Sequence, residues 1–219
     1  MKAAVVVYPG SNCDRDTYHA LKITGFEPSY VMFYEGEVDL SEFDLVVLPG
    51  GFSYGDYLRP GAVAARERIS RSVKRFAENG GLVLGICNGF QVLMEMGLLP
   101  GALLQNENGK FICKWVELKV QDNTTPFTLA FKKGERIRLP IAHGFGRYVK
   151  DGFPRVVLKY TKNVNGSDDR IAGVVNENGN VFGLMPHPER ASEDMLGGSD
   201  GRKVFQSLAM YLERRGKRS

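Results

Sequence analysis

The segment Gly85-Ile86-Cys87-Asn88-Gly89 places a cysteine between two glycines. With serine at its centre, this pattern forms the sharp strand-to-helix turn that holds a nucleophile in a strained conformation. A thiol at the start of a helix lies at the positive end of the helix dipole, which lowers its pKa from about 8.5 and favours the thiolate. A small buried residue at a glycine-rich turn is the alternative reading. Because an apolar run precedes Cys87 and a helical stretch follows it, we interpret Cys87 as a nucleophile.

The segment Met185-Pro186-His187-Pro188-Glu189 offers the base and the orienting acid that a cysteine nucleophile needs. Pro188 favours extended backbone at His187, and side chains two residues apart on an extended chain point to the same side. Glu189 would then hold one imidazole nitrogen, as the acid does in a Ser-His-Asp triad. The sequence therefore predicts a catalytic triad of Cys87, His187 and Glu189.

The oxyanion that forms at an attacked carbonyl needs backbone N–H donors. We expect one from Asn88, directly after the nucleophile, and one from Gly51 in the Gly50-Gly51 turn that ends another strand. Cys13 also lies between a strand and a helix and could be a second reactive thiol, but no glycines flank it. His143 competes with His187 as the base, yet it lacks a nearby carboxylate, and we prefer it as a wall of the substrate pocket.

The elements that position these residues are read from hydrophobic periodicity. Apolar runs alternate with amphipathic stretches in the first half, which predicts strands at 2–8, 29–34, 44–48 and 82–86 and helices at 14–24, 62–78 and 90–96. The second half predicts strands at 111–120, 136–141, 155–160, 171–175 and 181–185 and a helix at 202–214. Cys113, on the first of these later strands, is expected in the core. The fold class is thus α/β, an open and mostly parallel sheet flanked by helices, with an additional antiparallel β region in the second half.

Composition and charge exclude several classes of protein. The 219 residues contain three cysteines and three histidines without zinc-ligand spacing, so we expect neither disulfides nor a bound metal. The net charge of +4 comes largely from Arg214, Arg215, Lys217 and Arg218, which we read as a solvated tail and not as a nucleic-acid site. Neither a membrane span nor a signal peptide is expected. We expect one domain over residues 1–219 and a cytoplasmic location.

Taken in order, the three motifs around Gly51, Cys87 and His187 resemble the class I (triad) glutamine amidotransferases, which share a flavodoxin-like fold. The resemblance implies that the triad hydrolyses L-glutamine through a γ-glutamyl thioester and that the ammonia passes to a synthetase. It further implies glutamine contacts for Gly50, Gln91, His143, Gly144 and Phe145. The resemblance implies an acidic residue where Phe145 stands, and a glutamine contact made by the backbone at this position would tolerate the change.

Segments 8–16, 51–61 and 140–144 resemble, within this class, the glutaminase subunits of phosphoribosylformylglycinamidine synthase. This resemblance covers essentially the whole chain. It implies a large synthetase subunit and a small bridging subunit as partners, in purine biosynthesis. It also implies that ATP and Mg²⁺ bind to the synthetase and that no cofactor binds to this chain.

Other functions remain open from the residues. The chain could serve another amidotransferase of the guanylate, anthranilate or histidine pathway, although the segments at 9–16 and 52–61 favour the purine step. It could also be a non-catalytic glutamine-sensing or scaffolding module, which would need no triad. A cysteine hydrolase or chaperone-like protein on a related sheet need not carry the Pro-His-Pro-Glu unit.

Overall fold

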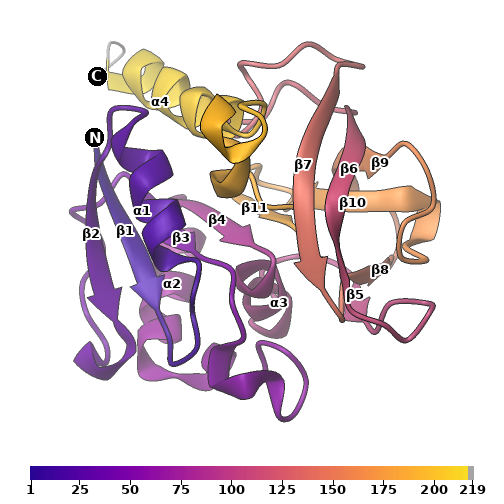
Figure 1. Ribbon diagram of the computed structural model, residues 1–219. Coiled ribbons are helices and arrows are strands. Elements are labelled where there is room, and N and C mark those ends of the chain that lie inside the picture. Colours follow the sequence, from indigo (N-terminus) through magenta and orange to yellow (C-terminus); the bar gives the residue numbers. More distant parts are fainter. Residues whose placement is uncertain (217–219) are drawn as a thin grey trace.

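The computed structural model describes residues 1–216 and is built around one mixed sheet of nine strands (Figure 1). The strands lie in the order β2-β1-β3-β4-β11-β10-β9-β6-β7. The first five are parallel to one another, and the remaining neighbours pair antiparallel. The antiparallel strands predicted in the second half therefore extend the parallel sheet. A small sheet of β5 and β8 was not predicted.

The strands are β1 (Lys2–Val7), β2 (Glu27–Met32), β3 (Leu45–Leu48), β4 (Leu82–Ile86), β5 (Ala102–Leu104), β6 (Ile112–Val120), β7 (Arg136–His143), β8 (Arg147–Val149), β9 (Arg155–Tyr160), β10 (Ile171–Val175) and β11 (Val181–Leu184). The α-helices are α1 (Asp14–Lys22), α2 (Arg68–Glu78), α3 (Asn88–Glu95) and α4 (Arg202–Gly216).

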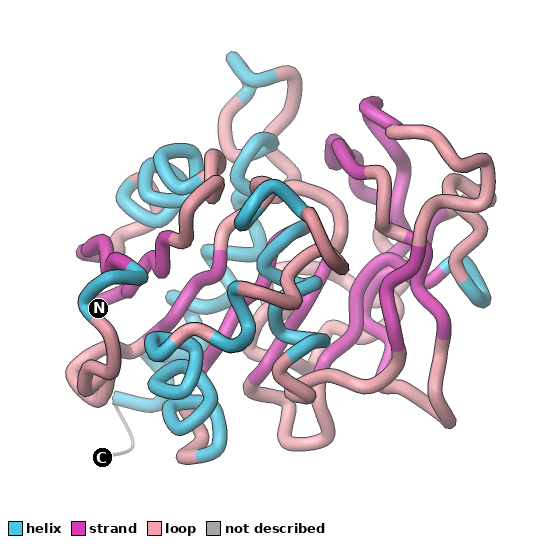
Figure 2. Tube along the Cα trace, turned by 90° about the horizontal axis from the view of Figure 1, so that it is seen from below, coloured by secondary structure: helices cyan, strands magenta, loops and turns pink. Residues whose placement is uncertain are grey.

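The strands at the centre of the sheet are apolar because both faces are covered. β3, β4, β10 and β11 are buried at every position. Figure 1 shows α1 in front of the sheet and α2 behind it, and Figure 2 shows helices on one side of the molecule and mainly strands and loops on the other. The two halves of the chain thus differ in structure. The first half forms a parallel sheet covered by helices, and the second half forms the antiparallel extension of that sheet.

The direction of the chain across the sheet reverses between β1 and β3. β1 leads through α1 to β2 on one side, while β3 leads through α2 to β4 on the other. Right-handed crossovers in opposite directions place their helices on opposite faces. In open α/β sheets, ligands bind at the carboxyl ends of the strands beside such a reversal. The loops that follow β1, β3, β4 and β11 are therefore the place to look for a site.

Several predicted elements have different boundaries in the structure, and the helix predicted at 62–78 differs most. The helix predicted at 62–78 begins only at Arg68, because Glu67 is extended with ψ 153° and Ala64–Arg66 forms a separate 3₁₀ turn. The strand predicted at 29–34 is β2, two residues earlier, where Glu27 pairs with Lys2 of β1.

The prediction that Cys113 lies in the core is wrong, because its side chain is exposed. β9 pairs with β6 only at residues 118–120, so the beginning of β6 extends past the neighbouring strand. Cys113 lies in this extension.

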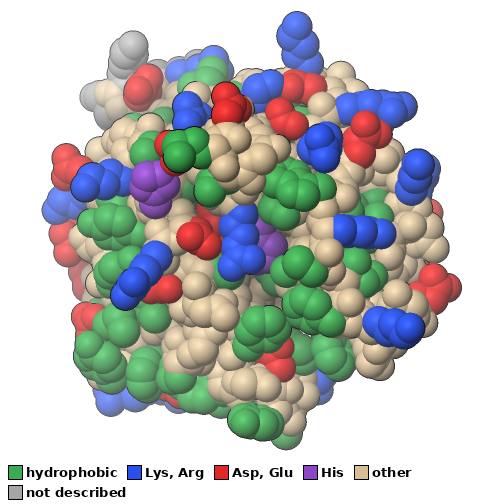
Figure 3. Space-filling model, in the orientation of Figure 1, with side chains coloured by type: hydrophobic (Ala, Val, Ile, Leu, Met, Phe, Trp, Pro, Cys, Tyr) green, Lys and Arg blue, Asp and Glu red, His purple; other side chains and the backbone are tan. Residues whose placement is uncertain are grey.

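Basic, acidic and hydrophobic side chains are interspersed on the face shown in Figure 3. Arg214 and Arg215 are exposed in α4, as expected for a solvated tail, while Lys217 and Arg218 lie outside the described residues. Tyr57 and Leu58, in the loop after β3, are 90% and 75% exposed. Within residues 1–216, no helix is long and apolar enough to cross a membrane.

Candidate active site

Cys87 occupies a sharp turn between β4 and α3, as the Gly-x-Cys-x-Gly pattern predicts. Its backbone has φ 51° and ψ −105°, a strained conformation for a residue with a Cβ. The flanking glycines are required by space: a Cβ at Gly89 would lie 1.9 Å from the carbonyl oxygen of Leu48, and one at Gly85 would lie 2.8 Å from that of Gly89. Cys87 is 4% exposed, and its thiol lies 3.7 Å from the carbonyl oxygen of Ala142.

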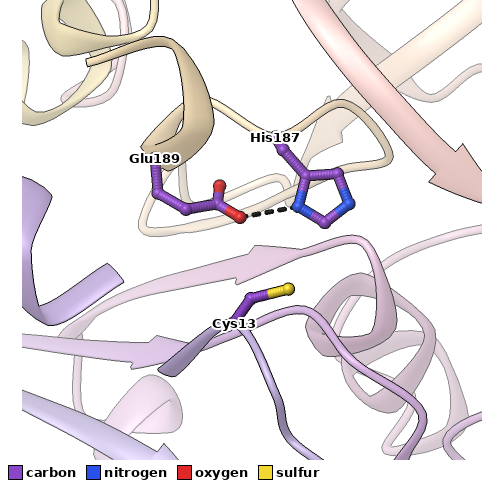
Figure 4. Close-up of side chains that lie close together, drawn as sticks. All are labelled: Cys13, His187 and Glu189. Atoms are coloured by element: carbon purple, nitrogen blue, oxygen red, sulfur yellow. Dashed lines mark hydrogen bonds and ion pairs between the residues drawn. The ribbon is translucent and has the colours of Figure 1, made fainter. Parts of the chain in front are cut away.

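His187 and Glu189 form a buried pair on the turn after β11 (Figure 4). Nδ1 of His187 lies 2.6 Å from Oε1 of Glu189, and the two residues are 2% and 1% exposed. Since the carboxylate accepts this hydrogen bond, the proton is on Nδ1. The predicted pairing is present, but its local reason was wrong. Pro188 is helical, with φ −67° and ψ −29°, and Glu189 opens a 3₁₀ turn instead of continuing an extended chain.

The strand register brings His187 to Cys87. β4 and β11 are parallel neighbours with Ile86 opposite Leu184, so the residues that follow both strands leave the sheet side by side. The amide of Cys87 donates to the carbonyl of Leu184 at 2.8 Å. The amide of His187 donates to Pro140 of β7 at 2.9 Å, which fixes the turn from its other side.

The electrostatics of His187 favour its charged form. Burial alone would lower the pKa of His187, but the Glu189 carboxylate and the Cys87 thiolate beside it prevail and raise the pKa well above 6.5. Nε2 of His187 has no hydrogen-bond partner among the described residues. The arrangement can therefore hold a thiolate–imidazolium pair with Nε2 available to move a proton.

Two backbone amides are available for an oxyanion. Neither the Gly51 amide nor the Asn88 amide donates to an acceptor within residues 1–216. Gly51 has φ 146°, and a Cβ there would lie 2.5 Å from the carbonyl oxygen of Gly10. A residue with a Cβ at position 51 would therefore displace this turn, so only glycine fits there.

Among the predicted glutamine contacts, Gln91 is hydrogen-bonded to the segment 143–145, whereas Gly50 is not. Nε2 of Gln91 donates to the carbonyl of Phe145 at 2.8 Å, and Oε1 of Gln91 accepts from the side chain of Asn88 at 2.9 Å. His143 is buried with Nδ1 on Asn106, and burial together with the charge of His187 lowers its pKa to about 4. This low basicity makes His143 a poorer general base than His187.

Cys13 and Arg190 join the site although neither was predicted there. Cys13 is 2% exposed, and its Sγ accepts a hydrogen bond from Nη2 of Arg190 at 3.0 Å. Figure 4 shows the thiol of Cys13 directed toward the ring of His187. A Cβ at Gly50 would lie 2.7 Å from Cε1 of His187 and 3.2 Å from the sulfur of Cys13, so Gly50 makes room for both. The position of Arg190, directly after Glu189, was the signal available in the sequence.

Cys13, His187 and Glu189 also have the spacing of a metal site, since their ligand atoms all lie within 4.8 Å of one another. The guanidinium of Arg190 points at the sulfur, and its positive charge opposes a cation there. The expectation that the chain binds no metal remains a prediction.

A cavity at the other end of the sheet contains none of these residues. It has a volume of about 900 Å³ and is lined by residues at the amino ends of strands, including Met1, Asp44 and Leu82. None of the predicted site residues lines it. Strained backbone, a buried ion pair and free amides all lie at the carboxyl ends, so we assign the site there.

The strained cysteine, the buried histidine–carboxylate pair and the free amides have the geometry that amide hydrolysis by a thiol requires, and they lie on an α/β sheet. The chain belongs to the CobB/CobQ-like glutamine amidotransferase domain family, which it matches over residues 1–153 and 147–200. It is a glutamine amidotransferase.

Two relatives and two solved structures are similar to this chain over nearly its full length. The chain is 69% identical to "Phosphoribosylformylglycinamidine synthase subunit PurQ" of Thermotoga maritima over 97% of this chain and 99% of that protein. It is 55% identical to the subunit of the same name from Pseudothermotoga lettingae, over 98% and 97% of the two chains. A chain in the structure of PurLQS from Thermotoga maritima superposes with a TM-score of 0.93 at 69% identity, covering 96% of this chain and 98% of that one. A glutamine amidotransferase from Thermotoga maritima, at 19% identity and a TM-score of 0.61, covers 100% of this chain and 85% of that one and shares the fold.

Proposed function

We propose that this chain is the glutaminase subunit of a phosphoribosylformylglycinamidine synthase and supplies ammonia for purine biosynthesis. The near full-length identity of 69% to PurQ of Thermotoga maritima supports this pathway over the guanylate, anthranilate and histidine pathways. The buried His187–Glu189 pair beside the strained Cys87 is the observation that carries the catalytic part.

The proposed partners are a large synthetase subunit and a small bridging subunit. A chain 69% identical to this one was solved as part of PurLQS, which supports an assembly of this kind. The synthetase would convert formylglycinamide ribonucleotide to its amidine, and ATP and Mg²⁺ would bind there. A cytoplasmic location completes the proposal, because a reducing compartment keeps a cysteine nucleophile as a free thiol.

The first half-reaction forms a thioester. The thiolate of Cys87 attacks the carboxamide carbon of glutamine, and the amides of Gly51 and Asn88 stabilise the oxyanion. Nε2 of His187 then protonates the leaving nitrogen, so that ammonia departs and the γ-glutamyl group remains on sulfur. Glu189 holds the proton on Nδ1 throughout and stabilises the imidazolium.

The second half-reaction hydrolyses the thioester. Nε2 of His187, now neutral, takes a proton from water, and the resulting hydroxide attacks the thioester carbonyl. The same two amides hold the second oxyanion. Its collapse releases glutamate and returns Cys87 to the thiolate, with His187 protonated for the next cycle.

The test is Cys87→Ala in the complex reconstituted with the synthetase. Glutamine-dependent formation of the amidine should be lost, while formation from added ammonium should persist, because only the source of ammonia is removed. Retention of glutamine-dependent activity would refute the proposed nucleophile.

A non-catalytic glutamine-sensing module is the second candidate, and the site geometry disfavours it. A sensor needs no strained thiol and no buried base beside it. Labelling by a glutamine-analogue electrophile separates the two functions. Stoichiometric modification at Cys87 supports the enzyme, whereas glutamine binding without modification supports the sensor.

A further inference from the structure

Asn106 lies in the loop between β5 and β6, is 2% exposed, and uses every hydrogen-bonding position of its side chain. Its Nδ2 donates to the carbonyls of His143 at 2.8 Å and Lys110 at 2.9 Å. Its Oδ1 accepts from the Gly146 amide at 3.1 Å and lies 3.1 Å from Nδ1 of His143. Its backbone amide donates to the carbonyl of Gly144 at 2.9 Å.

These partners fix the orientation of the Asn106 amide and the tautomer of His143. An amide N–H can only donate, so the oxygen of Asn106 must face Gly146, and its nitrogen faces the two carbonyls. Because Oδ1 is an acceptor, Nδ1 of His143 carries the proton. His143 is neutral near pH 7, since burial and the charge of His187 lower its pKa to about 4.

The contacts of Asn106 span the segment 143–146, which contains three of the predicted glutamine contacts. Asn106 binds the first, second and fourth residues of this segment, and Gln91 binds the third through the Phe145 carbonyl at 2.8 Å. The segment is therefore held from two sides, by Gln91 next to the nucleophile and by Asn106 from the far loop.

We propose that Asn106 is a positioning residue for glutamine binding, because it holds the segment 143–146 in its binding conformation before the substrate arrives. This inference rests on the proposed function. Without Asn106 the segment would have to be ordered at the moment of binding, and that entropic cost would weaken binding. Asn106 forms no hydrogen bond to Cys87, His187 or Glu189, so the chemical steps should be largely preserved.

Replacing the Asn106 side chain should leave the chain folded, because other contacts hold the neighbouring segments. The carbonyl of Gly146 accepts from Asn165 at 2.8 Å, and β6 and β7 pair up to the register of Ile112 with His143. Asn106→Ala therefore loosens the segment between contacts that remain. Asn106→Ser keeps one hydroxyl that can reach part of the network, and it provides a milder variant.

The experiment measures KM for glutamine and kcat in the reconstituted complex, with ammonium-dependent synthesis recorded in parallel. Asn106→Ala should raise KM at least tenfold and change kcat less than threefold. Asn106→Ser should raise KM by a smaller factor. Ammonium-dependent synthesis should match wild type. Gln105→Ala is the matched control, because Gln105 is exposed in the same loop and its side chain bonds only to Gly109, at 3.4 Å.

A KM within twofold of wild type for Asn106→Ala would overturn the proposal. So would a loss of kcat with unchanged KM, or a fall in ammonium-dependent synthesis parallel to the glutamine-dependent loss. Failure of the proposed function gives a different result, namely no glutamine-dependent activity in the wild-type complex.

Discussion

Replacing Cys87 by glycine is expected to give a more stable chain than replacing it by alanine. Cys87 has φ 51° and ψ −105°, which a residue with a Cβ adopts only with strain. Both substitutions remove the thiol, so their difference isolates the cost of the Cβ. Alanine keeps that cost, whereas glycine adopts this backbone conformation readily.

The size of the effect follows from two opposing quantities. Strain at a sparsely populated backbone conformation costs about 1–3 kcal/mol. Glycine loses about 0.5–1 kcal/mol more than alanine through its greater freedom in the unfolded chain, so the midpoints of the two ranges leave a net gain of about 1 kcal/mol. Since each kcal/mol shifts the melting temperature of a domain of this size by about 2–4 °C, Cys87→Gly should melt about 2–4 °C above Cys87→Ala.

Thermal unfolding of the chain, followed by circular dichroism or calorimetry, measures this difference. Cys113 provides the matched control because it lies in β6 and has no positive φ. There the order should reverse, with Cys113→Gly melting below Cys113→Ala. If Cys87→Gly melts at or below Cys87→Ala, the turn at the nucleophile stores no strain and the reasoning fails.

Three further substitutions test the base, the space around it and a titrating group. Glu189→Gln should lower kcat for glutamine hydrolysis by up to about 10⁴-fold, since the equivalent acid-to-amide change in a Ser-His-Asp triad costs about that factor; a loss below tenfold would contradict the role of Glu189. Gly50→Ala places a Cβ 2.7 Å from Cε1 of His187, so glutamine-dependent activity should fall at least tenfold while ammonium-dependent synthesis persists. Asp56→Asn should stabilise the chain at high pH, because burial raises the pKa of Asp56 from 3.8 to about 6 and the folded state disfavours the carboxylate. The gain in melting temperature over wild type should be small at pH 4, develop between pH 4 and about 6, and stay constant above; an equal gain at pH 4 and pH 8 would refute it.

The turn at Cys87 and the pairing of His187 with Glu189 could be predicted from the sequence because each motif is local. The turn at Cys87 is specified by its own flanking glycines, and Glu189 is two residues from His187. The error at Pro188 did not matter, since both an extended chain and a helical turn can place these two side chains together. Fold class followed in the same way, from alternating apolar runs.

The supporting contacts could not be predicted because they join segments that only the folded chain brings together. Asn106 meets the segment 143–146 across 37 or more residues, and Arg190 meets Cys13 across 177. The sequence around an asparagine in a polar loop does not distinguish a buried, fully hydrogen-bonded side chain from one exposed to solvent in a turn. The start predicted for α2, at residue 62, was too early for a related reason, because the break at Glu67 depends on how the preceding loop packs.

The strain at Cys87 persists because the sheet does not allow it to relax. β4 lies between β3 and β11, and its ladder to β11 continues one residue past the strand, through the bond from the Cys87 amide to Leu184. Rotating φ of Cys87 to a relaxed value would break that bond or move α3, whose Gly89 lies against the carbonyl of Leu48. The same ladder sets the distance from Cys87 to the turn that carries His187. The backbone strain at Cys87 and the alignment of Cys87 with His187 therefore have one cause. A substitution that weakens the pairing of β4 with β11 should lower glutaminase activity. It should also reduce the stability difference between Cys87→Gly and Cys87→Ala.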